Sequence, residues 1–163
     1  MTGTTPRPIL NLPTAIAVAT DAHAGQTDKG GDPYILHPLR VMLAVAPEHR
    51  VAAVLHDAIE DTPLTMVDLV THGLTLDDAA ALEALTRRDG ENYMGEYIER
   101  VARGPMRARW VKLADLEDNL DLDHNRPHVL PDTLRLRYDA ARDRIKAAIA
   151  SGPGMGRNID ELG

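Results

Sequence analysis

The sequence contains no cysteine, no phenylalanine and only one tryptophan among its 163 residues. The absence of cysteine excludes disulfides and thiolate ligands, so a transition-metal site must use imidazole and carboxylate groups. Because aromatic side chains are scarce, leucine, alanine, valine and isoleucine must fill the core, which favours helices over an aromatic-rich β-sandwich. We therefore expect an all-α protein.

A membrane span and an excess of basic residues are also missing. No stretch of about 18 apolar residues runs without interruption, and residues 1–12 do not combine a charged start with an apolar run. The formal net charge of −7 excludes a general nucleic-acid coat, because clustered Lys and Arg side chains hold phosphate backbones. We expect a soluble cytoplasmic protein that contacts neither membrane nor nucleic acid. A small phosphorylated ligand fits this charge only where cations converge locally, and a homo-oligomer stays open.

The length and the apolar periodicity indicate one helical domain. A chain of 163 residues corresponds to about one domain, and a Gly- and Pro-rich stretch at 152–156 follows the last periodic segment. We expect a single domain over 1–151 and a flexible tail over 152–163. Helices are predicted over about 12–24, 37–46, 47–62, 66–72, 76–86, 92–102, 106–119 and 130–150.

Four residues from three separate segments could close around one metal ion: His37, the adjacent pair His56 and Asp57, and Asp115. A mixed shell of nitrogen and oxygen ligands suits manganese, iron or zinc with open positions for water. A divalent ion in such a shell lowers the pKa of water enough to supply hydroxide near neutral pH, and hydroxide is a nucleophile for phosphorus. The order His, His-Asp, Asp resembles the signature of the HD metal-dependent phosphohydrolases.

The segment around His56 concentrates acidic groups. If 47–62 is one helix, His56 and Glu60 lie four residues apart on one face. Asp57 and Asp61 form a second such pair about 100° around the helix. No Lys or Arg lies among these residues, so the acids would repel one another without a cation. Ion pairing with other segments is the alternative to a metal, but we favour a divalent ion as the simplest neutraliser.

Three motifs follow one another along the chain. They are AHAGQ at 22–26 with PYILHP at 33–38, LHDAIEDT at 55–62, and KLAD at 112–115 followed by Asn119. Over about Ala15 to Asp121 they resemble the hydrolase domain of the RelA/SpoT-type alarmone enzymes, and more closely the small stand-alone alarmone hydrolases. The resemblance implies an all-α fold, an HD-domain helical bundle.

The resemblance also implies a reaction. It implies removal of the 3′-diphosphate from guanosine tetra- or pentaphosphate, with manganese or another divalent metal held by His37, His56, Asp57 and Asp115. The residues at Glu60 and Asp61 would position or activate the attacking water. We assign substrate binding to Lys29, Tyr34, Asn119 and Lys112.

Two positions depart from the pattern of this family. The family has an Arg before the position of Lys29, which packs on the guanine, whereas this chain has Asp28. After Asn119 the family has an Arg and a Thr that help to hold the phosphates and the sugar. This chain has Asp121 and Leu122 there. Both changes remove affinity for a polyanion.

Three basic residues could replace the lost cations, namely Arg87, Arg88 and Lys112. Each is also typical of a solvated surface side chain, and we favour that interpretation for all three. The metal centre is therefore better supported by the sequence than the guanosine substrate.

Two other functions remain open at this level. One is an HD phosphatase that acts on another nucleotide. The other is a non-catalytic HD protein that serves as a binding or antitoxin-like partner of an alarmone-type synthetase, and the presence of both Glu60 and Asp61 speaks against it.

Overall fold

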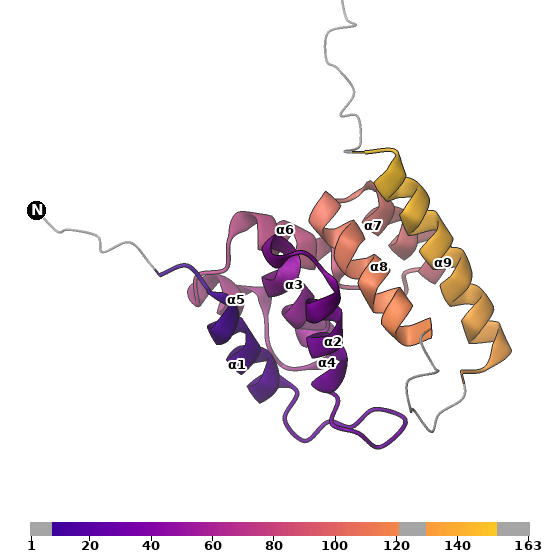
Figure 1. Ribbon diagram of the computed structural model, residues 1–163. Helices are drawn as coiled ribbons and strands as arrows, with labels where there is room; N and C mark the ends of the chain where they lie inside the picture. The colour runs from indigo at the N-terminus through magenta and orange to yellow at the C-terminus, as the bar shows by residue number, and fades with distance from the viewer. Residues whose placement is uncertain (1–7, 121–129, 153–163) are drawn as a thin grey trace, which may run out of the picture.

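The computed structural model describes residues 8–120 and 130–152, and Figure 1 shows how they are arranged. These residues form helices and no β-strand, apart from one isolated antiparallel bridge between Thr27 and Pro33. The all-α prediction is confirmed. The elements are α1 (Leu12–Ala22), α2 (Leu36–Ala44), the 3₁₀ turn η1 (Pro47–His49), α3 (Arg50–Leu55), α4 (Ala58–Asp61), α5 (Met66–Thr71), α6 (Leu76–Leu85), the π-helix η2 (Tyr93–Ile98), α7 (Glu99–Arg103), α8 (Met106–Leu120) and α9 (Asp132–Ala150).

Polar caps begin three of these helices. The side chains of Asn11, Thr65 and Thr75 accept hydrogen bonds from backbone amides in the first turns of α1, α5 and α6. Helix α5 is only six residues long and has a complete capping box, because Asp68 accepts from the Thr65 amide in return. Local sequence therefore defines these helix starts, as predicted.

Helix α3 lies at the centre of the bundle and packs against α1, α2, α6 and α8. Its side chains from Ala52 to Leu55 are fully buried. Helix α8 packs against α2, α3, α6, α7 and α9, and in Figure 1 α9 runs along α8 on the side away from α1. The core thus brings α2, α3 and α8 together, and these three elements carry the candidate site.

The predicted helix over 47–62 is wrong as one continuous helix, because it breaks at His56 and Asp57. The His56 amide lies 3.5 Å from the carbonyl oxygen of Ala53, three residues back, and Asp57 has φ −97° and ψ −8°. The imidazole of His56 also bonds to that Ala53 carbonyl oxygen, at 2.8 Å. This side-chain bond competes with the regular helical pattern. The pair His56/Glu60 therefore does not lie on one face of a continuous helix. The Asp61 amide still donates to the Asp57 carbonyl oxygen at 2.9 Å, and both carboxylates approach the Tyr34 hydroxyl.

The predicted helix over 92–102 also differs from the structure. It opens as the π-helix η2, in which the Tyr97 amide donates to the Asn92 carbonyl oxygen five residues back, at 3.0 Å. The wider turn is a rare local form that apolar periodicity does not reveal. Tyr93 and Tyr97 from η2 both line the cavity of the candidate site.

No helix within 8–120 and 130–152 combines the length and the apolar character that a membrane crossing requires. Residues 153–163 of the expected tail lie outside the described part of the chain. The single domain over 1–151 stays a prediction.

Candidate metal centre and active site

His56 projects from the break between α3 and α4 into a buried cluster. Its Nδ1 donates to the Ala53 carbonyl oxygen, which leaves Nε2 as an acceptor. Within the described residues Nε2 is buried without a hydrogen-bond partner, yet it lies 3.0 Å from Asp57 Oδ2. Two acceptor atoms at this distance require a proton or a metal cation between them. Burial lowers the pKa of His56, but Asp57 and Asp115 outweigh it and raise the pKa well above its ordinary value, so the local field favours positive charge.

His37 enters the same cluster from the first turn of α2. Its Nδ1 lies 2.6 Å from Asp118 Oδ2 on α8. Its Nε2 lies 3.2 Å from Asp115 Oδ1 and 3.5 Å from Asp57 Oδ2. Each histidine is thus held through Nδ1 and presents Nε2 to the cluster, which is the usual arrangement of a metal-binding histidine.

Asp115 is buried on α8, and both of its oxygens have partners. Lys112 Nζ donates to Oδ2 at 2.7 Å, and Asn119 Nδ2 donates to Oδ1 at 2.7 Å. The i−3 and i+4 spacings place both donors on the same face of α8 as the carboxylate. Burial raises the pKa of Asp115, but the Lys112 ammonium and the two imidazoles outweigh it and hold the pKa well below the usual range. The carboxylate is therefore ionised at neutral pH.

Four ligand atoms converge from three segments: His37 Nε2, His56 Nε2, Asp57 Oδ2 and Asp115 Oδ1. The four distances from a histidine nitrogen to an aspartate oxygen run from 3.0 to 3.7 Å. Atoms about 2.1 Å from one ion are about 3.0 Å apart at adjacent octahedral corners and about 3.4 Å apart in a tetrahedron. This His/Asp group can therefore hold a metal ion, and His37, His56 and Asp115 alone already have the required proximity.

Residues of the first motif hold Asp57 and the end of α4 in place. Tyr34 donates its hydroxyl hydrogen to Asp57 Oδ2 at 2.6 Å. Gln26 donates to the Asp61 carbonyl oxygen at 2.9 Å, and its own amide oxygen lies 2.8 Å from His23 Nδ1. The AHAGQ motif is thus a structural support for the HD segment.

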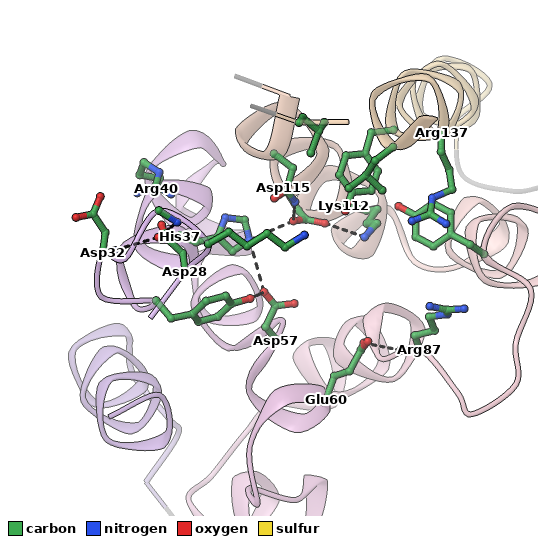
Figure 2. A pocket seen from close by; sticks show the side chains of 18 of the residues that line it. Asp28, Asp32, His37, Arg40, Asp57, Glu60, Arg87, Lys112, Asp115 and Arg137 are labelled. Carbon is green, nitrogen blue, oxygen red and sulfur yellow. Dashed lines mark hydrogen bonds and ion pairs between the residues drawn. The ribbon is translucent and has the colours of Figure 1, made fainter. Parts of the chain in front are cut away.

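A cavity of about 450 Å³ opens from this cluster. In Figure 2 Asp28 and Asp32 lie on the side of His37, and Arg87 and Arg137 lie on the opposite side. Five basic and five acidic side chains line the cavity, so its formal charge is balanced, and a divalent ion would make it positive. The basic residues are Lys29, Arg40, Arg87, Lys112 and Arg137, and the acidic ones are Asp28, Asp32, Asp57, Glu60 and Asp115.

The two predicted catalytic acids occupy different positions. Glu60 lines the cavity, and its Oε2 accepts a hydrogen bond from the Arg87 amide at 3.0 Å. Asp61 does not belong to the cavity lining, and its Oδ2 lies 3.4 Å from the Tyr34 hydroxyl. Burial, followed by the charge of Asp57, raises the pKa of Asp61; burial also raises the pKa of Glu60, against the hydrogen bond from Arg87. Both shifts increase the proton affinity of these carboxylates.

The four residues predicted to bind substrate all line the cavity, but only one is exposed. Lys29 is exposed, whereas Tyr34 bonds to Asp57 and Asn119 bonds to Asp115. The interpretation of Lys112 as a solvated surface side chain is wrong. It is 8% exposed, and its ammonium lies 2.7 Å from Asp115 Oδ2 and 4.9 Å from the centre of the Tyr97 ring. Tyr97 and Asp115 offset the cost of burying this cation.

The two departures from the family pattern have different outcomes. Asp28 lines the cavity, and its Oδ1 accepts hydrogen bonds from the amides of Gly30 at 2.8 Å and Asp32 at 3.0 Å. The carboxylate therefore closes a turn as well as adding negative charge. Asp121 and Leu122 lie outside the described residues.

Sequence reasoning missed several residues of the site. Asp118 and Arg40 follow the predicted ligands Asp115 and His37 by three residues, a helical spacing that could have indicated them. Three tyrosines and one arginine also escaped notice, because a π-helix and the packing of α9 bring them to the cavity. These are Tyr93, Tyr97, Arg137 and Tyr138.

The chain is similar to curated bacterial proteins over much of its length. It is 34% identical over 125 residues to the bifunctional (p)ppGpp synthase/hydrolase SpoT of Escherichia coli strain K12, which covers 69% of this chain and 18% of that protein. It is 35% identical over 116 residues to the guanosine-3′,5′-bis(diphosphate) 3′-pyrophosphohydrolase of Vibrio cholerae, which covers 63% of this chain and 16% of the relative. The chain thus spans less than a fifth of the length of these relatives. No protein-family model matches it.

A solved structure shares the fold over nearly the whole chain. It superposes with a TM-score of 0.67 at 25% identity and covers 89% of this chain and 88% of the other. That structure is described as a metazoan ortholog of SpoT that hydrolyzes ppGpp and plays a role in starvation responses. In sequence and in fold, this all-α chain resembles the HD-domain SpoT-type 3′-pyrophosphohydrolases.

Proposed function

We propose that the chain is a manganese-dependent phosphohydrolase that removes the 3′-diphosphate from guanosine tetra- or pentaphosphate and releases pyrophosphate. The observation that carries this proposal is the convergence of two imidazoles and two carboxylates on one point of a cavity, at the spacing of a metal shell. The proposed reaction comes from the names of the relatives, which include 3′-pyrophosphohydrolases.

In this proposal His37, His56, Asp57 and Asp115 hold the ion. Manganese suits the mixed nitrogen and oxygen set, because it accepts both donor types and leaves positions open. When bound, such an ion supplies Lewis-acid chemistry: it polarises phosphoryl oxygens and makes water more acidic. Hydrogen bonds to Ala53, Tyr34, Asp118 and Lys112 orient the four side chains that would hold the ion.

The cavity charge suits a polyanionic substrate once the ion is present. The basic and acidic side chains of the lining balance, so a divalent ion sets the formal charge at about +2. The whole chain carries −7, so attraction for phosphate requires a local excess of positive charge such as this one. Lys29 is exposed and lines the cavity, and in this proposal it meets the distal phosphate of the diphosphate.

Glu60 takes the role of proton acceptor in this proposal. It lines the cavity, and the Arg87 amide orients its carboxylate. Its raised pKa makes it a stronger base than an exposed glutamate. Asp61 follows Glu60 in the chain, and its carboxylate lies 3.4 Å from the Tyr34 hydroxyl.

The test is turnover of guanosine tetraphosphate by the purified full chain loaded with manganese, with pyrophosphate and the nucleoside 5′-diphosphate measured as products. Metal content is measured on the same sample, and about one ion per chain is expected. If the protein hydrolyses another phosphorylated nucleotide but not guanosine tetraphosphate, the proposed substrate is wrong and the alternative of an HD phosphatase remains. Full metal occupancy with no turnover on a nucleotide panel would instead favour a binding partner.

A further inference from the structure

Asp118 links the predicted ligand His37 to an arginine of the cavity. His37 Nδ1 lies 2.6 Å from Asp118 Oδ2. Arg40 donates through Nε to Asp118 Oδ1 at 2.7 Å and through NH2 to Oδ2 at 3.2 Å. The carboxylate is thus held by two parallel bonds from one guanidinium while it accepts from the imidazole.

The link runs from two largely buried side chains to one that is partly exposed. His37 and Asp118 keep 9% and 12% of their side-chain surface, and Arg40 keeps 38% and lines the cavity. The link joins α2 to α8, which pack against each other. A two-point arginine contact fixes the plane of a carboxylate far better than a single bond does.

The two candidate histidine ligands are therefore oriented in different ways. His56 bonds to the backbone carbonyl of Ala53, which no substitution at that position removes. His37 depends on a side chain instead. The orientation of the His37 ring can therefore be altered without touching any ligand atom.

We propose that Asp118 and Arg40 act as a positioning pair that holds His37 Nε2 toward the metal. Asp118 orients the ring by accepting from Nδ1, and Arg40 fixes the plane of the Asp118 carboxylate. This role rests on the metal site of the proposed function. It does not depend on which phosphorylated compound is hydrolysed.

Removal of Arg40 should change metal affinity in opposite directions if it acts by positioning or only by its charge. Arg40 lies on the same cavity as the candidate ligands, so a purely electrostatic effect of its guanidinium would repel a metal cation. Its removal would then tighten metal binding. A positioning role predicts the opposite, because the carboxylate that orients His37 loses its two-point contact.

The experiment measures manganese affinity of the full chain by competition with a chromophoric chelator. Asp118→Leu keeps the branching at Cγ but removes both oxygens, and it should weaken binding by about 10- to 100-fold, the usual cost of losing the residue behind a metal-bound histidine. Asp118→Asn keeps an acceptor oxygen and should rescue part of this loss. Arg40→Ala should weaken binding by up to about tenfold.

Arg137→Ala is the matched control, since it removes a guanidinium from the same cavity that stacks on Tyr93, 4.9 Å from the ring centre. It should leave manganese affinity unchanged or tighten it. Unfolding midpoints in chelator show whether each variant is folded, and a merely structural role would lower the midpoint without a matching loss of metal affinity. A further check is that Asp118→Asn should bind manganese more tightly than Asp118→Leu.

Three results would overturn the positioning pair. They are affinity within twofold of wild type for Asp118→Leu, tighter binding by Arg40→Ala, and no manganese binding by the wild-type chain. The last result would also remove the metal site. Tight, Asp118-dependent binding with no turnover of guanosine tetraphosphate would overturn the proposed substrate alone.

Discussion

The two ends of the cavity are built differently. The inner end, formed by His37, His56, Asp57 and Asp115, is mostly buried, and each of its side chains has a partner that orients it. The outer rim is formed by side chains that are mostly exposed: Asp28, Lys29, Asp32, Arg87 and Arg137. Geometry is therefore fixed at the inner end, whereas the rim mainly contributes charge.

This difference separates chemistry from recognition. Preorganised ligand atoms can bind an ion without rearranging, which is what a catalytic centre requires. Exposed rim charges are screened by solvent and salt, and each contributes little on its own. Substitutions at the inner end should therefore abolish function, and substitutions at the rim should only tune it.

The largest effect is expected from removing a ligand of the inner end. Asp115→Ala or His56→Ala takes one donor from the four converging atoms, so we expect bound manganese to fall from about one ion per chain to none. Elemental analysis of protein purified without chelator measures this. Asp77→Asn, an exposed acid in the first turn of α6, is the control and should keep its metal. Full occupancy in both ligand variants would show that the ion lies elsewhere.

A second test separates proton transfer by the acids next to the inner end from metal holding within it. Glu60→Gln and Asp61→Asn keep the shape but cannot accept a proton, so kcat should fall by roughly 10² to 10⁴ while the ion stays bound. Because burial raises the pKa of Glu60, the wild-type rate should fall as the pH decreases through that raised value. The acidic limb of the pH profile should vanish in Glu60→Gln. Wild-type turnover in both variants would refute the role of this segment.

The sequence could indicate the residues of the inner end because they lie within its recognisable motifs. His37, His56, Asp57 and Asp115 were proposed together, and in the structure Nε2 of each histidine lies within 3.7 Å of an oxygen of each aspartate. Their role as metal ligands remains a prediction. The helix break at His56 was missed, because it results from a ring-to-backbone bond that apolar periodicity does not detect.

Lys112 illustrates why the supporting residues were harder to predict. A lysine three residues before an aspartate on a helix is usually a solvated surface pair. Its burial depends on Tyr97, which reaches the cavity only through the π-turn of η2. The wrong surface interpretation thus follows from an irregular helix and not from the lysine itself.

The buried contact of Lys112 gives the next prediction, on stability. Lys112→Met leaves the Asp115 carboxylate buried without its cation, which should cost about 3–5 kcal/mol of unfolding free energy in chelator. A bound divalent ion supplies a replacement charge, so the loss should be smaller in manganese. Urea unfolding under both conditions measures this. Lys146→Met breaks an ion pair to Glu117 in which both side chains are half exposed, and it should change stability by less than about 1 kcal/mol. Equal losses of unfolding free energy with and without manganese would contradict the idea that the ion replaces the charge of Lys112.

The smallest effect is expected at the rim, where Asp28 both repels a polyanion and closes a turn. Asp28→Asn keeps the side-chain oxygen that accepts from the Gly30 and Asp32 amides but removes the charge. We expect it to lower KM for guanosine tetraphosphate several-fold, within the tenfold that corresponds to about 1.4 kcal/mol. Asp28→Arg reverses the charge but loses both turn bonds, so its gain should be smaller than the change in charge alone implies.

The salt dependence of KM decides whether charge causes this gain. Asp28 is partly exposed, so the advantage of Asp28→Asn should shrink as ionic strength rises, because the screening length falls from about 10 Å at 0.1 M to about 3 Å at 1 M. Asp77→Asn on α6 removes the same charge outside the cavity lining and should leave KM unchanged. Either an unaltered KM in Asp28→Asn or a gain that persists at high salt would show that this aspartate acts through the shape of its turn. The rim would then share the fixed geometry of the inner end.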